Sequence, residues 1–322
     1  MMKNRITQVL LIAVVVIIAA LSIVFWPNGE ESGNKVVRFG SFSVAVDYAP
    51  YLVAKNQKWF EEALLDDGYT AEYTVFQSLP PINESLATGR VDVVFEAEPP
   101  AIVGKAAGID VKIVGLSCSL VQEILVPTES KVQSLADLKG NKIAVLAGTS
   151  SHYGLLKIIQ QAGLKPSDVE VIDMIPPDAK NAFETDQVGA WAVWPPFVEQ
   201  QEIAGKGRVL SGGDAVIHSI MAVRGAFAQN HPTLVKELLG VLQRAKLWIQ
   251  TNPDNAMKII AEELNISLDV VKKAWPRHDW SSQVTETIIT DIQAKADFLS
   301  NNNFIRNKVN VQDLIDSSFE TN

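Results

Sequence analysis

Short apolar runs alternate with amphipathic stretches along most of this chain. The runs predict buried strands at Val36–Phe39, Ala71–Phe76, Val91–Phe95, Val111–Leu116, Glu123–Pro127, Ile143–Leu146, Val169–Met174, Gly189–Val193 and Ile217–Val223. Helical spacing predicts helices at Ala49–Glu62, Pro81–Thr88, Pro99–Gly108, Ser134–Gly140 and Leu155–Gly163, and then at Pro232–Thr251, Pro253–Leu264, Ser267–Trp275 and Thr285–Asn301. Strand alternating with helix predicts an α/β fold in which helices cover parallel sheets.

Two extended segments, Glu123–Pro127 and Ile217–Val223, link the two α/β units. They predict two lobes, with residues 36–126 and 217–322 in lobe 1 and residues 127–216 in lobe 2. Ligands of such sheets bind outside the carboxyl ends of the strands. We therefore expect an interlobe cleft lined by the loops Ser41–Asp47, Glu96–Pro100, Gly148–Ser151, Ile175–Asp178 and Trp194–Phe197.

The N-terminal residues 1–26 have the pattern of a membrane segment. Lys3 and Arg5 precede an apolar run from Val9 to Trp26, which is long enough to span a bilayer. The run ends without the small residues of a cleavage site, so an uncleaved anchor is favoured over a removed signal peptide. Either reading exports the rest of the chain to the periplasm or the outer face of the cytoplasmic membrane, behind a polar linker at residues 27–35.

Composition excludes several classes of function. The chain has 322 residues and a formal net charge of −9, which argues against a nucleic-acid partner. Four histidines and one cysteine show no metal-ligand spacing, so we expect no metal and no other cofactor. The single cysteine, Cys118, follows an apolar run and is expected to be a buried, inert thiol.

The stretch Lys142–Leu156 holds the strongest candidate site. A strand ends in a turn at Gly148, and Thr149, Ser150 and Ser151 stand where the next helix begins. A helix start leaves backbone N–H groups without intrahelical partners and carries partial positive charge. Three hydroxyls there predict an oxyanion site. The alternative is that Thr149 or Ser150 only caps the helix.

Acidic and aromatic side chains in the other loops complete the candidate site. Glu96 and Glu98 share a face if their strand continues to Pro99, and we expect one or both to bind a ligand ammonium group rather than only solvent. Asp47 either contacts ligand or closes its loop. Trp194 and Phe42 are expected to form aromatic walls, which suit amphiphilic or cationic ligands, with core packing as the alternative.

Several segments together resemble a known family. They are Ala49–Ala54 with Trp59–Phe60, Leu86–Asp92, Leu135–Gly140 with Ile143–Val145, Ser150–Tyr153 with Leu155–Leu156, Ala192–Pro196, and Val223–Arg224 with His231–Pro232. The chain resembles the periplasmic binding proteins of ABC importers for taurine, alkanesulfonates and nitrate, a family that includes thiamin-precursor binders.

The resemblance implies a two-lobed type II binding fold that closes on its ligand like a hinge. It also implies that Thr149–Tyr153 contacts a sulfonate and that Trp194 lines the cleft. Taurine binders carry an aspartate where this chain has Ser219, so the acidic group is either relocated or the ligand differs.

We therefore predict a monomeric, non-enzymatic importer component that binds a small organic sulfonate and delivers it to a membrane permease. A binder of a cationic or heterocyclic solute is the alternative. An enzyme on the same fold is a third reading, but the sequence shows no nucleophile placed beside a base, and Ser150 and His152 are too close along the chain to show one.

Overall fold

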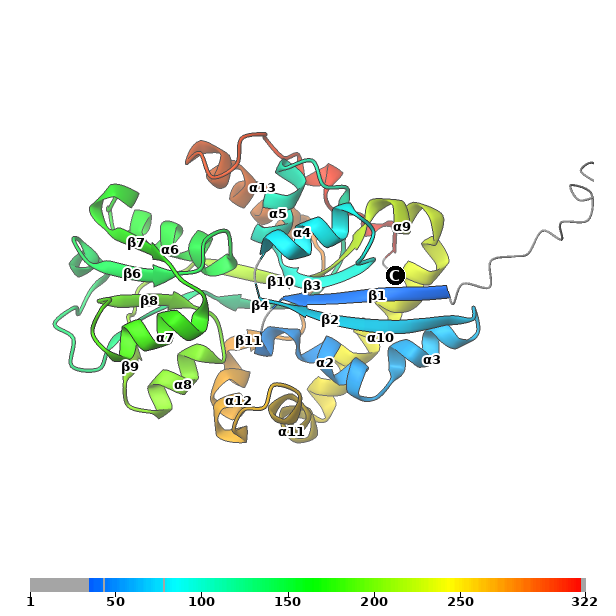
Figure 1. Cartoon of the computed structure of the whole chain (residues 1–322), viewed down its shortest axis with the longest axis horizontal. Coiled ribbons are helices and arrows are strands. Elements are labelled where there is room, and N and C mark those ends of the chain that lie inside the picture. The colour runs from blue at the N-terminus through cyan, green and yellow to red at the C-terminus, as the bar shows by residue number, and fades with distance from the viewer. Residues whose placement is uncertain (1–34, 43, 78, 320–322) are drawn as a thin grey trace, which may run out of the picture. The chain divides into compact units, whose positions relative to one another are not determined.

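A computed structural model describes residues 35–42, 44–77 and 79–319 and contains two mixed β-sheets with helices on their faces (Figure 1). The six-stranded sheet has the order β11-β4-β10-β3-β1-β2, formed by β1 (Lys35–Phe42), β2 (Tyr69–Phe76), β3 (Val93–Ala97), β4 (Val111–Val121), β10 (Val216–Arg224) and β11 (His278–Asp279). The five-stranded sheet has the order β7-β6-β8-β5-β9, formed by β5 (Glu123–Pro127), β6 (Lys142–Val145), β7 (Glu170–Asp173), β8 (Ala190–Val193) and β9 (Gly207–Val209).

The sheets are mixed, and the prediction of parallel sheets was wrong in this respect. Parallel pairing joins β1 to β3 and β6 to both β7 and β8. The two connecting strands run the other way: β10 is antiparallel to β3 and β4, and β5 is antiparallel to β8 and β9. These strands carry the chain between the sheets, so they enter each sheet against the direction of its βα units.

Most of the predicted helices are present. The helices are α2 (Ala49–Asn56), α3 (Trp59–Leu65), α4 (Leu79–Ala87), α5 (Glu98–Ala106), α6 (Ser150–Gln161), α7 (Pro176–Glu184), α8 (Phe197–Ile203), α9 (Gly225–Asn230), α10 (Pro232–Thr251), α11 (Pro253–Glu263), α12 (Leu268–Ala274) and α13 (Glu286–Asn301). Short 3-10 helices are η1 (Val46–Tyr48), η2 (Leu135–Leu138), η3 (Pro166–Asp168), η4 (Trp275–Arg277), η5 (Val311–Asp313) and η6 (Ser317–Phe319). The helices α7, α8 and α9 were not predicted, and the predicted helix at Ser134–Gly140 is the short 3-10 helix η2.

One predicted helix is divided. The pattern over Ala49–Glu62 predicts a single helix, but Lys58 adopts a left-handed conformation with φ of 58° and separates α2 from α3. A left-handed residue cannot continue a right-handed helix. The division lets Tyr51 of α2 stack on Phe95 of β3 at 4.3 Å while Phe60 of α3 packs on Phe39 of β1 at 4.8 Å.

The helix after β6 buries one face against the five-stranded sheet. Leu155, Leu156, Ile158 and Ile159 of α6 pack in a cluster with apolar residues of β5, β6 and β8. Complete burial of such a side chain contributes about 1.5–3 kcal/mol, so this stripe fixes where α6 begins relative to the sheet. Figure 1 shows α6 on one side of this sheet and α7 and α8 on the other.

No helix among residues 35–42, 44–77 and 79–319 has the length and apolar character needed to cross a bilayer. The predicted membrane segment at residues 1–26 and most of the linker at residues 27–35 lie outside the described residues.

Candidate functional site

The end of β1 and the end of β8 meet, although the two strands belong to different sheets. The indole Nε1 of Trp194 donates to the carbonyl of Val44 at 2.9 Å, and the N–H of Val46 donates to the carbonyl of Pro195 at 3.4 Å. The rings of Phe42 and Trp194 lie 5.8 Å apart, and both side chains are 5% exposed. The two predicted aromatic residues therefore lie together at the junction between the sheets.

The start of α6 uses two of its three hydroxyls within the protein. Thr149 is the N-cap: its Oγ1 accepts from the N–H of His152 at 3.4 Å and donates to the carbonyl of Leu146 at 2.7 Å. The Oγ of Ser151 donates to Oε1 of Gln122 at 3.0 Å, and Ser151 is fully buried. The hydroxyls of Thr149 and Ser151 both donate to acceptors within the protein, so neither can also donate to an anion in this arrangement.

Ser150 is the hydroxyl that remains. It is partly exposed, and within the described part of the chain its Oγ has no hydrogen bond. The N–H groups of Ser150 and Ser151 lie in the first turn of α6, where helix geometry provides no carbonyl partner. Gly148 forms the preceding turn with φ of 77°, and its N–H donates to Nδ1 of His152 at 3.1 Å. Burial lowers the pKa of His152, which favours the neutral acceptor form. The helix start thus offers two N–H groups and one hydroxyl to an oxyanion.

Glu96 is a buried carboxyl without a partner. It is 0% exposed, and neither oxygen has a hydrogen bond among the residues that the structure describes. Burial raises its pKa to about 8. Glu96 lies opposite Ile220 of β10, and α6 packs against both β10 and α5. An unpartnered buried carboxyl is costly, so a cationic group that entered here would be held strongly.

Asp47 is a second buried carboxyl near the same place. It lies in η1 and accepts a hydrogen bond at 2.6 Å from Oγ of Ser219, while its Oδ1 has no partner among the described residues. Burial raises its pKa to about 6. Burial first, and then the charges of Asp47 and Glu96, raise the pKa of Tyr48, so both carboxyls act on one hydroxyl. Ser219 of β10 therefore donates to the acidic side chain of a neighbouring element, η1.

Glu98 does not share a strand face with Glu96. The strand ends at Ala97 and α5 begins at Glu98, so the condition for a shared face is not met. The carboxylate of Glu98 forms an ion pair with Lys295 and accepts from the N–H of His218 at 2.9 Å. Both ionic side chains are almost fully buried. Lys295 therefore neutralises Glu98 within the protein, whereas both oxygens of Glu96 and Oδ1 of Asp47 have no hydrogen-bond partner among the described residues.

A hydroxyl does lie beside a base, which the sequence did not show. Nδ1 of His218 lies 2.6 Å from Oγ of Ser119, and Nε2 of His218 lies 3.0 Å from Oδ2 of Asp291. Ser119, however, pairs with β10 on one side and β11 on the other, so its backbone is held in two ladders. Hydrolytic serines stand instead on turns whose free N–H groups stabilise an oxyanion. We interpret this chain of hydrogen bonds as a brace between β4, β10 and α13.

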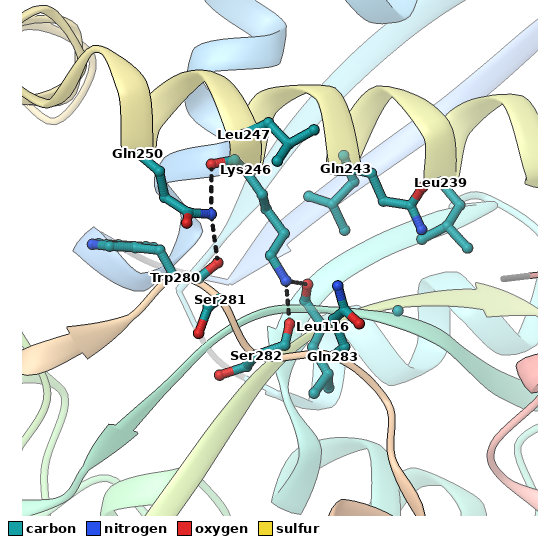
Figure 2. Close-up of a pocket in the computed structure, with 12 residues that line it drawn as sticks. Leu116, Leu239, Gln243, Lys246, Leu247, Gln250, Trp280, Ser281, Ser282 and Gln283 are labelled. Carbon is teal, nitrogen blue, oxygen red and sulfur yellow. Dashed lines mark hydrogen bonds between the residues drawn. The ribbon is translucent and has the colours of Figure 1, made fainter. Parts of the chain in front are cut away.

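A cavity of about 230 Å³ lies beneath α10, and Figure 2 shows residues that line it. Its described lining comes from α10, β4 and residues 280–283. Nζ of Lys246 donates to the carbonyls of Leu116, at 2.9 Å, and Ser282, and Gln250 donates to the carbonyl of Trp280 at 3.4 Å. These donors join α10 to the polypeptide below it. The ring of Trp280 also stacks on that of His278, with 4.8 Å between the ring centroids.

Cys118, which was predicted to be a buried and inert thiol, lies in the interior of the protein. Cys118 is fully buried, and its Sγ donates to the carbonyl of Asp47 at 3.5 Å. Burial raises the pKa of the thiol. No group of three or more metal-ligating side chains occurs among the described residues.

This chain is similar to proteins of known family and to proteins of known structure over most of its length. The NMT1-like family matches residues 31–263. A Bacillus subtilis protein is 31% identical over 97% of this chain and 94% of its own length, and it is named a putative aliphatic sulfonates-binding protein. The alkanesulfonate-binding protein SsuA from Xanthomonas axonopodis pv. citri, solved with bound MOPS, superposes with a TM-score of 0.78 at 24% identity over 87% of this chain and 97% of SsuA. The desulfurization enzyme DszB has the same fold, with a TM-score of 0.66 at 16% identity over 88% of this chain and 97% of DszB.

Proposed function

Because this chain belongs to the NMT1-like family, we propose that it is the extracytoplasmic solute-binding component of an ABC importer and binds a small organic sulfonate. The names of its relatives support this proposal, as do the contacts at the junction of the two sheets. The observation that carries it is the start of α6, where two N–H groups and the Ser150 hydroxyl remain available as donors. α6 packs against β10 and α5, the two elements next to Glu96, whose carboxyl has no partner among the described residues.

Each part of the ligand has a counterpart in the protein. The sulfonate oxygens accept from the N–H groups of Ser150 and Ser151 and from the Ser150 hydroxyl. The rings of Trp194 and Phe42 cover the ligand body. Glu96, with Asp47 nearby, receives an ammonium group when the ligand has one, as in an amino-sulfonate such as taurine. The surrounding burial strengthens every one of these polar contacts.

The two sheets form the two lobes of a type II binding fold in this proposal. Because β5 pairs within the five-stranded sheet, we place the first passage between the lobes at Gln122. The bonds from Trp194 to Val44 and from Val46 to Pro195 join the lobes directly, as expected for a closed arrangement. Rotation about the passages then breaks these bonds and opens the cleft to solvent.

The partners follow from the same role. A monomer outside the cytoplasmic membrane receives a small solute and passes it to the importer's permease. The segment at residues 1–26 either anchors the protein or is removed after export. The net charge of −9 gives no reason to expect a nucleic acid.

Isothermal titration with a panel of ligands tests this function. Taurine, ethanesulfonate, nitrate and a thiamin pyrimidine are titrated into the protein, and each mixture is then analysed for chemical change. Binding of at least one sulfonate without turnover is the expected result. A panel in which no sulfonate binds would refute the proposal, and turnover would replace it with the enzyme alternative.

A second candidate ligand class is a cationic heterocycle of the thiamin-precursor type. The observation in its favour is that two buried carboxyls, Asp47 in η1 and Glu96 in β3, lie on elements next to β1, whose last residue, Phe42, packs against Trp194. Aromatic faces attract cations by about 0.5–2 kcal/mol. Preference for the pyrimidine over both sulfonates in the same panel would favour this class.

A further inference from the structure

Gln122 stands between two strands that belong to different sheets. β4 ends at Val121 and β5 begins at Glu123, so one residue makes the passage. The N–H of Gln122 donates at 2.8 Å to the carbonyl of Ala215, which directly precedes β10, the strand that returns the chain to the six-stranded sheet. The two passages between the sheets are therefore tied to each other at Gln122.

The side chain of Gln122 is bonded entirely to the five-stranded sheet and its helix. It is 3% exposed, and its Nε2 donates to the carbonyls of Val193, at 2.8 Å, and Glu123, at 2.9 Å. Its Oε1 accepts from the hydroxyl of Ser151 at 3.0 Å. Carbonyls only accept hydrogen bonds, so the amide nitrogen must face them and the oxygen must face Ser151. One amide thus holds the first turn of α6 and the residue that precedes Trp194.

α6 lies directly on the stem of this side chain. A Cβ atom built on Gly154 would lie 2.1 Å from Cγ of Gln122 and 2.7 Å from its Cβ. Such distances do not occur between carbon atoms that are not bonded, so glycine is required at this point of close approach. Contact with Gln122 therefore sets how closely α6 approaches the sheet. The same contact sets the position of the free N–H groups at the start of α6.

We propose that Gln122 is the positioning residue of the anion site: it holds the start of α6 and the end of β8 in one fixed arrangement and carries both as a unit when the lobes move. This inference rests on the proposed function. Gln122 acts through Ser151 and Val193 rather than by touching the ligand. Since its side chain bonds only to the five-stranded sheet and α6, the movement takes place on the side of Val121 and Val216, where the chain joins the six-stranded sheet. The anion site then keeps its shape throughout.

The test compares Gln122→Met with Gln201→Met. Gln201 is a matched control, because it is also a buried glutamine of lobe 2 and its Nε2 donates to Glu184 at 2.9 Å, but it lies in α8. Both variants should melt at a lower temperature than the parent. Only Gln122→Met should bind ethanesulfonate more weakly, by about tenfold or more for the loss of positioning hydrogen bonds. An unchanged dissociation constant in Gln122→Met would overturn the proposal.

A second variant keeps the test decisive if Gln122→Met does not fold. Ser151→Ala removes one bond of the arrangement and should weaken ethanesulfonate by about three- to tenfold. If Gln122→Met folds, the double variant Gln122→Met with Ser151→Ala should lose no more affinity than Gln122→Met alone, because both changes act on one contact. Additive losses, or full affinity in Ser151→Ala, would overturn the proposal. Failure of the parent to bind any sulfonate would instead refute the proposed function and this inference with it.

Discussion

Replacing Glu96 by Gln tests how the charge of the ligand is recognised. Glu96 is 0% exposed and has no hydrogen-bond partner among the described residues, and burial raises its pKa to about 8. Its carboxyl therefore keeps its proton at neutral pH when no ligand is present. An ammonium group needs the carboxylate, so an amino-sulfonate must displace this proton when it binds.

The size of the effect follows from the pKa. The ionised fraction of a group with a pKa of 8 is about 1% at pH 6 and about 50% at pH 8. If the ammonium group lowers the pKa of Glu96 to well below 6 in the complex, the affinity for taurine should rise about 50-fold between pH 6 and pH 8, or about 2 kcal/mol. The affinity rises with pH because the free protein holds the proton that the complex has lost.

Isothermal titration at pH 6, 7 and 8 measures this dependence directly, and buffers of different ionisation enthalpy count the protons released. Ethanesulfonate is the matched ligand, because it has the sulfonate and lacks the amine. In Glu96→Gln, taurine should bind more weakly and lose its pH dependence, whereas ethanesulfonate should keep its affinity within a few-fold. Taurine binding without proton release, or with the same pH slope in the variant, would refute the reasoning.

Three further predictions concern the anion site and the buried charges. Ser150→Ala should weaken sulfonate binding by about 1–3 kcal/mol in titration calorimetry, whereas Thr149→Ala should mainly lower the free energy of unfolding by about 1 kcal/mol; the opposite pattern would assign the anion to Thr149. Lys295→Met should lower the free energy of unfolding by about 3–5 kcal/mol in urea titration, since it leaves the fully buried Glu98 without its cation. The double variant Lys295→Met with Glu98→Gln should recover part of this loss. An unchanged urea midpoint in Lys295→Met alone would contradict the pairing. Burial raises the pKa of Glu199 from 4.5 to about 7, so its contribution to stability is present below pH 4.5 and is lost as the pH rises to 7; melting curves should therefore decline less over this window in Glu199→Gln than in the parent.

Local patterns in the sequence predict most of the elements. β5 and α10 have the bounds that were predicted, Glu123–Pro127 and Pro232–Thr251. Each has a clear local signal: β5 is a short apolar run that ends at a proline, and α10 begins at a proline and keeps one apolar face. The three-residue strand β9 and the two-residue strand β11 carry no such signal, because pairing with neighbours alone defines them.

The sequence predicted the helix start at Thr149, Ser150 and Ser151 but not which of its hydroxyls already have partners. Thr149, Ser150 and Ser151 were recognised as a helix start, and capping by Thr149 was one of the readings left open. Ser151 donates a hydrogen bond to Gln122, 29 residues earlier in the chain, and this contact depends on how α6 packs over the connection between the sheets. No local pattern carries that information.

Long-range pairing also decides the roles of the acidic residues. Glu96 and Glu98 are equivalent by local pattern, yet one is unpartnered and the other pairs with Lys295, 197 residues away. Ser219 reaches Asp47 across 172 residues. Tertiary contacts of this kind separate a structural ion pair from a candidate ligand group.

Because Gln122 alone connects β4 to β5, the length of this connection cannot change without shifting β5. Leu125 belongs to one apolar cluster, while its neighbours Ile124 and Val126 belong to the other, on the opposite face of β5. An extra residue inserted after Gln122 would turn every side chain of β5 to the wrong face. Length changes and inserted reporter domains should therefore be tolerated in surface loops but not here, because this one-residue connection also fixes the register of the sheet that it enters.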